Sequence, residues 1–226
     1  MCIGFGGRRD GAFVTPSQGH SGAVFNSMEA SGGFVKMVDV GPAELGRYAD
    51  VPIAFRVRSV LEIEVRRKGI GGITMTERPL EKPYTKDYDA YPESGPVTWP
   101  GRFDVGRWGF FLALEGSEAV GAAAVAFDTP GVDMLCRRRD LAVLWDIRVR
   151  PERRQQGVGT LLFEHVSNWA RERACLQLRV ETQNTNVPAC RFYVRRGCRL
   201  GCIDVDGYFG APEVAGEVKL VWCLDL

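Results

Sequence analysis

Residues 146–160, DIRVRPERRQQGVGT, decide the fold, because they connect an apolar strand to a helix through a turn that holds two glycines. Gly157 and Gly159 lack the Cβ atoms that would keep a ligand away from the backbone. The first amides of a helix have no partner within it, and together with the positive end of the helix dipole they favour a bound phosphate. We therefore expect a phosphate or pyrophosphate on this turn, with Arg154 adding positive charge.

Three interpretations of the turn compete. In the first, the two glycines only shape a tight connection between strand and helix. A dinucleotide-binding fingerprint is the second: a strand precedes the turn, a helix follows, and Glu181 comes about twenty residues further on. Against that fingerprint, Leu162 occupies the place of its third glycine. A P-loop is excluded, because no Gly-Lys-Ser/Thr is present.

The third interpretation uses a second pattern further along the chain. The segment that follows the next strand reads Asn-x-x-Ala-x-x-x-Tyr-x-x-x-Gly, with Asn186, Ala189, Tyr193 and Gly197 at the fixed positions. Preceded by Arg-x-x-Gly-x-Gly at 154–159, it resembles the GNAT superfamily of N-acetyltransferases. Within that superfamily, residues 181–201 (ETQNTNVPACRFYVRRGCRLG) are most similar to the streptothricin acetyltransferases.

The resemblance implies an enzyme that transfers an acetyl group from acetyl-CoA to a primary amine of a small molecule, such as an antibiotic, without a metal ion. The pantetheine arm would pair with the backbone of Ile147, Arg148 and Val149, and Asn186 would form a hydrogen bond with it, although an Asn before a helix is also a good N-cap. The pyrophosphate would rest on the turn and the helix start. The residues expected there are Arg154, Gln155, Gln156, Gly157, Val158, Gly159 and Thr160.

The resemblance also implies the catalytic groups. Freeing the lone pair of an alkyl ammonium at pH 7 costs about 4–5 kcal/mol, so a nearby carboxylate helps. We expect Glu181 to be this base and Asp146 to be the alternative, although either acid could instead pair with an arginine. Tyr193 matches the general acid that protonates the departing thiolate, although an aromatic residue on a helix is more often a core residue.

Periodicity predicts an α/β fold, and the GNAT resemblance implies a mixed, mostly antiparallel sheet of six to seven strands. The sheet should be splayed at its centre and flanked by about four helices. A strand is expected at 34–40, two short helices broken at Pro52 over 43–68, and a further strand at 73–79. The long loop that follows, residues 80–107, should wall the acceptor pocket. The pocket residues expected are Tyr84, Asp87, Tyr88, Asp89 and Trp108.

Composition narrows the class of protein. The 226 residues carry a net charge of +1, so no global field would gather nucleic acid or a membrane surface. Seven cysteines without a Cys-x-x-Cys pair favour reduced thiols in a cytoplasmic protein. We expect a disordered extension at 1–34 and one catalytic domain at 35–226, compatible with a homodimer. A catalytically silent CoA-binding module and a dinucleotide-dependent oxidoreductase remain alternatives.

Overall fold

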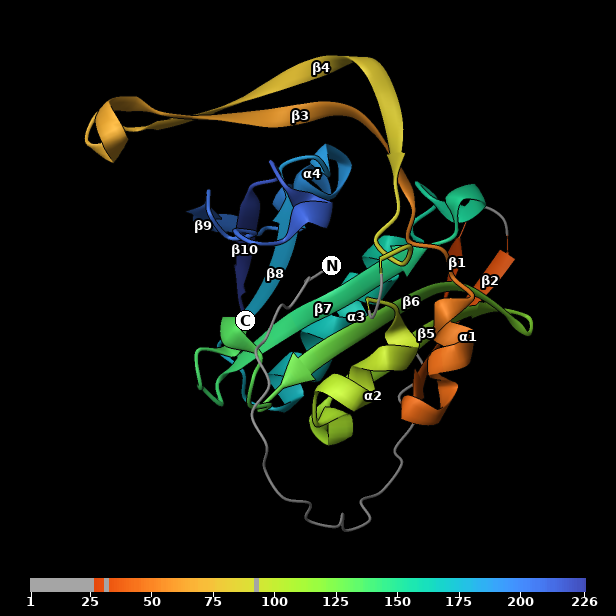
Figure 1. Cartoon of the computed structure of the whole chain (residues 1–226). Coiled ribbons are helices and arrows are strands. Elements are labelled where there is room, and N and C mark those ends of the chain that lie inside the picture. Colours follow the sequence, from red (N-terminus) through yellow and green to blue (C-terminus); the bar gives the residue numbers. More distant parts are fainter. Residues whose placement is uncertain (1–26, 31–32, 92–93) are drawn as a thin grey trace.

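The computed structural model describes residues 27–30, 33–91 and 94–226. Eight strands form one sheet in the order β1-β2-β5-β6-β7-β8-β10-β9, and β3 and β4 form a separate two-stranded ribbon (Figure 1). The sheet strands are β1 Ser27–Ala30, β2 Gly33–Val40, β5 Gly109–Glu115, β6 Glu118–Phe127, β7 Leu141–Val149, β8 Gln177–Gln183, β9 Arg199–Asp204 and β10 Lys219–Asp225. The ribbon consists of β3 Phe55–Val65 and β4 Ile73–Lys86. The α-helices are α1 Leu45–Ala49, α2 Trp99–Arg102, α3 Val158–Glu172 and α4 Val187–Arg195.

Every neighbouring pair in the sheet is antiparallel except β7 and β8, which run parallel. The expected mixed, mostly antiparallel sheet is therefore confirmed, with one strand more than the expected range because the short β1 adds to the edge. The prediction of a strand at 34–40 is also confirmed, by β2. A dinucleotide-binding domain needs a mostly parallel, doubly wound sheet, so the oxidoreductase alternative is wrong for this fold.

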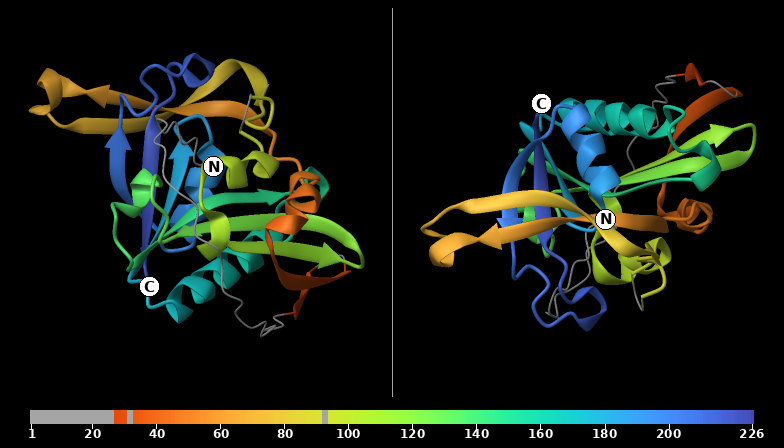
Figure 2. Two further views of the ribbon diagram at one scale, coloured as in Figure 1. Left: turned by 60° about the horizontal axis from the view of Figure 1, so that its bottom comes forward. Right: turned by 90° about the horizontal axis from the view of Figure 1, so that it is seen from above.

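Helices cover both faces of the sheet (Figures 1 and 2). Helix α3 has one apolar face, and its residues Leu162, Val166, Trp169 and Ala170 are all buried against the sheet. Apolar residues at this spacing of three and four positions lie on one side of a helix. Helix α4 belongs to the same cluster. The opposite face packs against α1 and α2 through a second cluster that contains Leu45, Trp99 and Trp108.

A bulge in β7 creates the opening at the centre of the sheet. Ala124 of β6 pairs with Asp146 and Val125 pairs with Leu144, so Trp145 is an extra residue on β7. The parallel pairing of β7 with β8 ends at Leu144 and Val180, although both strands continue. The strands therefore separate beyond these two residues, and among the described residues no strand pairs with the edge of β7 that faces β8.

The second helix expected at 43–68 is wrong. The first helical segment exists as α1, but residues 55–65 form β3. Apolar Phe55, Val57, Leu61 and Ile63 recur with a period of about two between charged residues, which suits a strand, and three of the eleven residues are valines. Gly69 and Gly72, with φ of 101° and 90°, form the hairpin turn that leads to β4 rather than the end of a helical unit.

The expected long loop at 80–107 is only partly a loop. Strand β4 continues to Lys86 through Pro79 and Pro83, which is tolerated because each strand of a two-stranded ribbon has a free edge. Short helical turns, including α2, occupy much of residues 96–107. Most of the disordered extension expected at 1–34 lies outside the described residues, and its described part holds β1 and the start of β2. No helix of the described residues is long and apolar enough to cross a membrane.

Candidate active site

The glycine turn has the backbone shape expected for a phosphate site. Gln155 and Gly157 have φ of 63° and 92°, and Gly157 caps α3 without a side-chain hydrogen bond. The first bond along the helix runs from the amide of Leu161 to the carbonyl of Gly157. The amides of Val158, Gly159 and Thr160 therefore precede the first helical hydrogen bond and can donate to an anion.

The two glycines of the turn differ in their surroundings. A Cβ on Gly157 would meet no atom within 4 Å, and its left-handed φ disfavours any other residue. A Cβ on Gly159 would lie 3.7 Å from Phe192 and Val149, which is ordinary van der Waals contact. The backbone shape of the turn therefore needs a glycine at 157, whereas the protein has room for a methyl group at 159.

Arg154 connects the turn to the start of the β3–β4 ribbon. Its Nε donates to the carbonyl of Val149 at 3.0 Å, and its Nη2 donates to the carbonyl of Ala54 at 2.8 Å. Burial lowers the pKa of this guanidinium, and the nearby Glu152 acts in the opposite direction. Both contacts are to neutral oxygens, so the positive charge remains available to an anion on the turn.

Glu181 lies on β8 one residue beyond the last β7–β8 pair, and only 3% of its surface is exposed. Its Oε1 accepts a hydrogen bond of 2.8 Å from the phenol of Tyr208, and its Oε2 lies 3.5 Å from Nζ of Lys219. The arginines considered from the sequence are not its partners in these contacts. The carboxylate is thus held at the opening of the sheet by residues from the last loop and strand.

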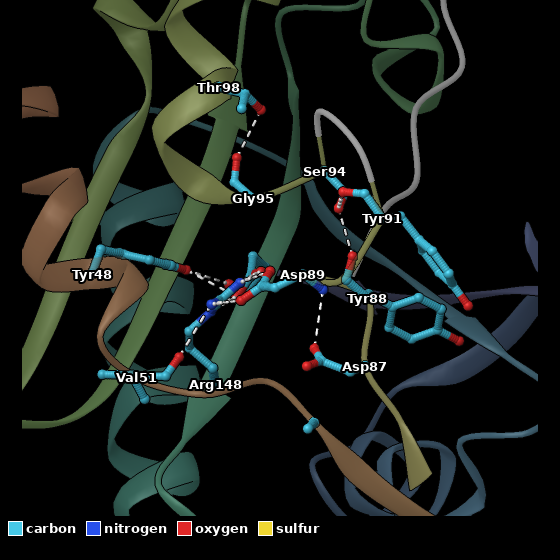
Figure 3. Close-up of polar contacts among 12 residues, drawn as sticks. Tyr48, Val51, Asp87, Tyr88, Asp89, Tyr91, Ser94, Gly95, Thr98 and Arg148 are labelled. Atoms are coloured by element: carbon cyan, nitrogen blue, oxygen red, sulfur yellow. Dashed lines mark hydrogen bonds and ion pairs between the residues drawn. The ribbon is translucent and has the colours of Figure 1, made fainter.

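Asp146 is the centre of a buried ion network at the same opening, and Figure 3 shows its partner Arg148 between Tyr48, Val51 and Asp89. Its two oxygens accept from Nε and Nη2 of Arg148 at 3.0 and 2.6 Å, and the Oδ1 also accepts from the Tyr48 hydroxyl at 3.0 Å. Arg148 additionally donates to both oxygens of Asp89, at 2.7 and 3.2 Å, and to the carbonyl of Val51. The arginine pairing considered from the sequence is therefore the arrangement that Asp146 adopts.

The network shifts the proton affinities of its members. Burial raises the pKa of Tyr48 well above its ordinary value, and the Asp146 carboxylate adds to the effect. Burial alone would lower the pKa of Arg148, but the charge of Asp146 and its hydrogen bonds raise it above the ordinary value. Arg148 and Tyr48 thus keep their protons at neutral pH, and the network is held together by an ionised arginine between two acids.

Asn186, which precedes α4, and Tyr193, which lies on it, have clear local roles. Asn186 caps the helix, because its Oδ1 accepts from the amide of Ala189 at 3.2 Å. Its Nδ2 is the part of the side chain that could serve a ligand. Tyr193 is 2% exposed and its ring packs against Phe163 and Phe192, with centroids 5.8 and 5.2 Å away. The N-cap and the helix thus bring both residues to the α3 side of the opening.

The cysteines near the site are packing residues. Cys190 is 3% exposed, and its Sγ lies 3.4 Å from the hydroxyl of Thr182. Burial raises the pKa of the Cys190 thiol above its ordinary value and that of the Cys198 thiol to about 12. Neither is a thiolate at neutral pH, which favours a packing role over nucleophilic catalysis.

The residues expected in the acceptor pocket divide between different surroundings. Tyr88 is buried and donates to Glu217 Oε2 at 2.9 Å, while Asp89 is held by Arg148. Asp87 accepts from the amide of Asp89, and Tyr84 is 41% exposed. Trp108 lies in the cluster with α2, where its indole donates to Thr129, so it belongs to the core.

Three residues of this region escaped the sequence analysis: Tyr208, Glu217 and Lys86. The ammonium of Lys86 lies 2.5 Å from Glu217 Oε1 and 5.3 and 5.1 Å from the ring centroids of Tyr88 and Tyr91. Together with the Tyr208–Glu181 bond, these contacts fix the loop at 205–218 beside the opening. An aromatic residue between glycines, as in Asp206–Gly210 (DGYFG), was the one signal for Tyr208 in the sequence.

Comparison with known sequences decides the family. The sequence pattern described as "Acetyltransferase (GNAT) family" matches residues 73–198, more than half of the chain. The chain belongs to the GNAT family. This GNAT chain is 29% identical over 185 residues to a streptothricin acetyltransferase of Escherichia coli, covering 82% of this chain and 93% of that protein. It is 30% identical over 149 residues to streptothricin acetyltransferase A of Bacillus subtilis (strain 168), covering 66% and 78%.

Solved structures show the same fold. A nourseothricin acetyltransferase superposes with a TM-score of 0.67 at 24% identity, over 84% of this chain and 98% of that one. A predicted streptothricin acetyltransferase from Bacillus anthracis str. Ames, solved in complex with acetyl coenzyme A, superposes with a TM-score of 0.64 at 23% identity, over 85% and 97%. These superpositions show the same fold, while the match to the GNAT family and to the two streptothricin acetyltransferases identifies the chain as an acetyl-CoA-dependent N-acetyltransferase and confirms the expected enzyme class.

Proposed function

We propose that this GNAT enzyme acetylates a primary amine of a cationic antibiotic of the streptothricin class. The observation that carries the proposal is the match to two streptothricin acetyltransferases over most of their length, combined with a buried carboxylate, Glu181, at the opening between β7 and β8. Tyr208 contacts this carboxylate, Tyr88 packs in the same cluster as Tyr208, and Glu217 accepts a hydrogen bond from Tyr88. Such groups favour an ammonium ion over a neutral acceptor.

The donor fits the residues at the other side of the opening. The amides at the start of α3 and the charge of Arg154 suit the pyrophosphate of acetyl-CoA, and a Cβ at Gly157 would point into open space. The edge of β7 beyond Leu144 offers backbone groups of Ile147 and Val149 to the amide groups of pantetheine. Acetyl-CoA supplies the activated acyl group. The side chain of Arg148 serves the ion network rather than the coenzyme.

The proposed chemistry moves three protons. Glu181 takes the first from the acceptor ammonium, and the free amine attacks the thioester carbonyl. As the C–S bond breaks, Tyr193 donates the second to the departing thiolate, whose conjugate acid has a pKa near 8.5 against about 10 for a phenol. The nitrogen gives up the third as the amide forms, and this proton restores the phenol of Tyr193, so the net reaction releases the one proton taken by Glu181. We assign Asp146 a positioning role rather than the base role, because Arg148 binds both of its oxygens, at 3.0 and 2.6 Å, in a fully buried ion pair, whereas Lys219 lies 3.5 Å from Glu181.

An acceptor series tests the proposal. The purified full-length chain is incubated with acetyl-CoA and streptothricin, and thiol release is followed together with the mass of the product. The matched control is streptothricin whose amines have been chemically acetylated beforehand. We expect release of one CoA per acetyl group gained and none with the blocked acceptor. Binding of acetyl-CoA without thiol release for any cationic amine would instead support the catalytically silent module.

A further inference from the structure

The ribbon of β3 and β4 projects from the body of the enzyme. Backbone and side-chain bonds between Leu61 and Asn184, at 2.9 and 3.0 Å, anchor its middle, and an ion pair joins Glu77 to Arg191 of α4. Beyond these anchors, residues 64–75 extend past the body. The tip stands clear of the sheet and helices in every view of Figures 1 and 2.

The two faces of the ribbon differ in character. On the outer face, Arg78 pairs with Glu62 at 3.0 Å, so the charges there are neutralised within the ribbon. On the inner face, Ile63 lies opposite Met75 and Val65 opposite Ile73. Leu61 and Ile63 pack on the body's own core, whereas the next residues of the same apolar face, Val65 and Ile73, are 42% and 49% exposed.

This exposed apolar face indicates a contact surface. A two-stranded ribbon is marginally stable on its own in water, and contiguous apolar surface on a folded protein marks an interaction site. At the tip, Ile70 is 94% exposed and stands beside the exposed cations Arg67 and Lys68. The surface that the tip would bind should therefore be both apolar and acidic.

The chain itself has a surface with these properties. In the loop at 205–218, Phe209 and Val205 are 94% and 45% exposed, next to the exposed acids Asp206 and Glu213. The loop forms an open pocket of about 430 Å³. Val205, Asp206, Phe209 and Pro212 are among the residues that line it.

We propose that the ribbon binds a second copy of this chain, with the tip of each ribbon seated on the 205–218 loop of the other copy. A twofold axis satisfies both contacts at once, because each copy offers one tip and one loop. The net charge of +1 gives two copies no strong mutual repulsion. On each copy, the projecting residues 64–75 and the loop at 205–218 together supply about as many residues as one side of a standard interface, which has about 20–30.

The mass of the protein in solution is the first test. Sedimentation equilibrium of the full chain should give twice the chain mass of 25.0 kDa. Ile73→Asp, which places a carboxylate on the exposed apolar face, should raise the dimer dissociation constant at least tenfold. The matched control is Thr76→Asp, an exposed position on the outer face of the same strand, which should leave it within about twofold. A monomer at all concentrations, or equal effects of the two variants, overturns the proposal.

A charge swap tests the pairing of tip with loop. Arg67→Glu and Asp206→Arg should each weaken the dimer, because each sets like charges against each other. The double variant should recover most of the wild-type affinity, since the pair is restored with reversed signs. Single variants that leave the dimer intact, or a double variant weaker than both, would overturn this contact. A monomeric wild type that binds nucleic acid through Arg67 would overturn it as well.

Discussion

Tyr208 donates a hydrogen bond to Glu181, with 2.8 Å between Oη and Oε1, across 27 positions of the sequence. The same phenol oxygen accepts from Nε2 of Gln183 at 2.8 Å. Tyr208 therefore satisfies two polar groups that are themselves buried, and it fixes the loop at 205–218 to the carboxylate that we propose as the base.

Replacing Tyr208 by phenylalanine should destabilise the fold. Glu181 Oε1 and Gln183 Nε2 stay buried and each loses a partner, which costs about 1–3 kcal/mol. Urea denaturation measures the change in free energy of unfolding. The control is Tyr84→Phe, because Tyr84 is 41% exposed, and it should change stability by less than about 0.5 kcal/mol. Equal stability of the two variants would contradict the buried role of Tyr208.

The buried tyrosines predict a loss of stability in alkali. Burial raises the pKa of Tyr48, Tyr88 and Tyr208 above the ordinary value of 10.0. Above pH 10 the unfolded chain releases these phenolic protons while the folded chain keeps them, so the unfolded state is favoured as pH rises. The contribution is fully present below pH 10.

Urea unfolding between pH 8 and pH 11 checks this linkage. The difference in unfolding free energy between wild type and Tyr208→Phe should be constant up to about pH 10 and shrink above it, because the phenylalanine variant has no phenolic proton to hold at that position. A difference that grows with pH would show that the phenol is not kept protonated by burial.

The two glycines of the phosphate turn should respond differently to alanine. Gly157→Ala forces an L-residue into a left-handed φ and should weaken acetyl-CoA binding at least tenfold, measured by calorimetry. Gly159→Ala adds a methyl group that meets Phe192 and Val149 at 3.7 Å, so it should leave affinity within about threefold. Native affinity in Gly157→Ala would remove the turn as the pyrophosphate site.

The local part of the site could be predicted from the sequence. The glycine turn and the buried face of α3 depend on residues within one strand-turn-helix segment, and the cap at Asn186 depends on residues within the next, so spacing carries the information. Residues 55–65 were misread because isolated apolar residues can satisfy both a helical and a strand period. The charge alternation of Glu62 and Glu64 between Leu61, Ile63 and Val65 was the better guide.

The partners of Glu181 and Asp146 could not be predicted. Tyr208 and Lys219 reach Glu181 from a loop and a strand far along the chain, and nothing in their own neighbourhoods shows that pairing. The bulge at Trp145 also has no local signature. It turns Asp146 and Arg148 toward Tyr48 of α1, so the arrangement of the ion network depends on tertiary packing.

Arg148 should be essential for stability. Its side chain is fully buried between Asp146 and Asp89, so Arg148→Met leaves two acids without their cation and should cost about 3–5 kcal/mol in urea denaturation. Arg56→Met, at an exposed position of β3, is the matched control and should cost less than about 1 kcal/mol. Similar costs for the two variants would contradict the network.

The pH dependence of acetyl transfer tests the proposed mechanism most directly. Initial rates of thiol release with streptothricin are measured from pH 6 to pH 9 for wild type, Glu181→Gln and the control Glu213→Gln, an exposed acid of the neighbouring loop. Glu181→Gln should lower the rate on the order of a hundredfold near pH 7 and recover partly as solvent deprotonates the amine. Glu213→Gln should follow wild type. A Glu181→Gln profile that coincides with wild type would contradict the account.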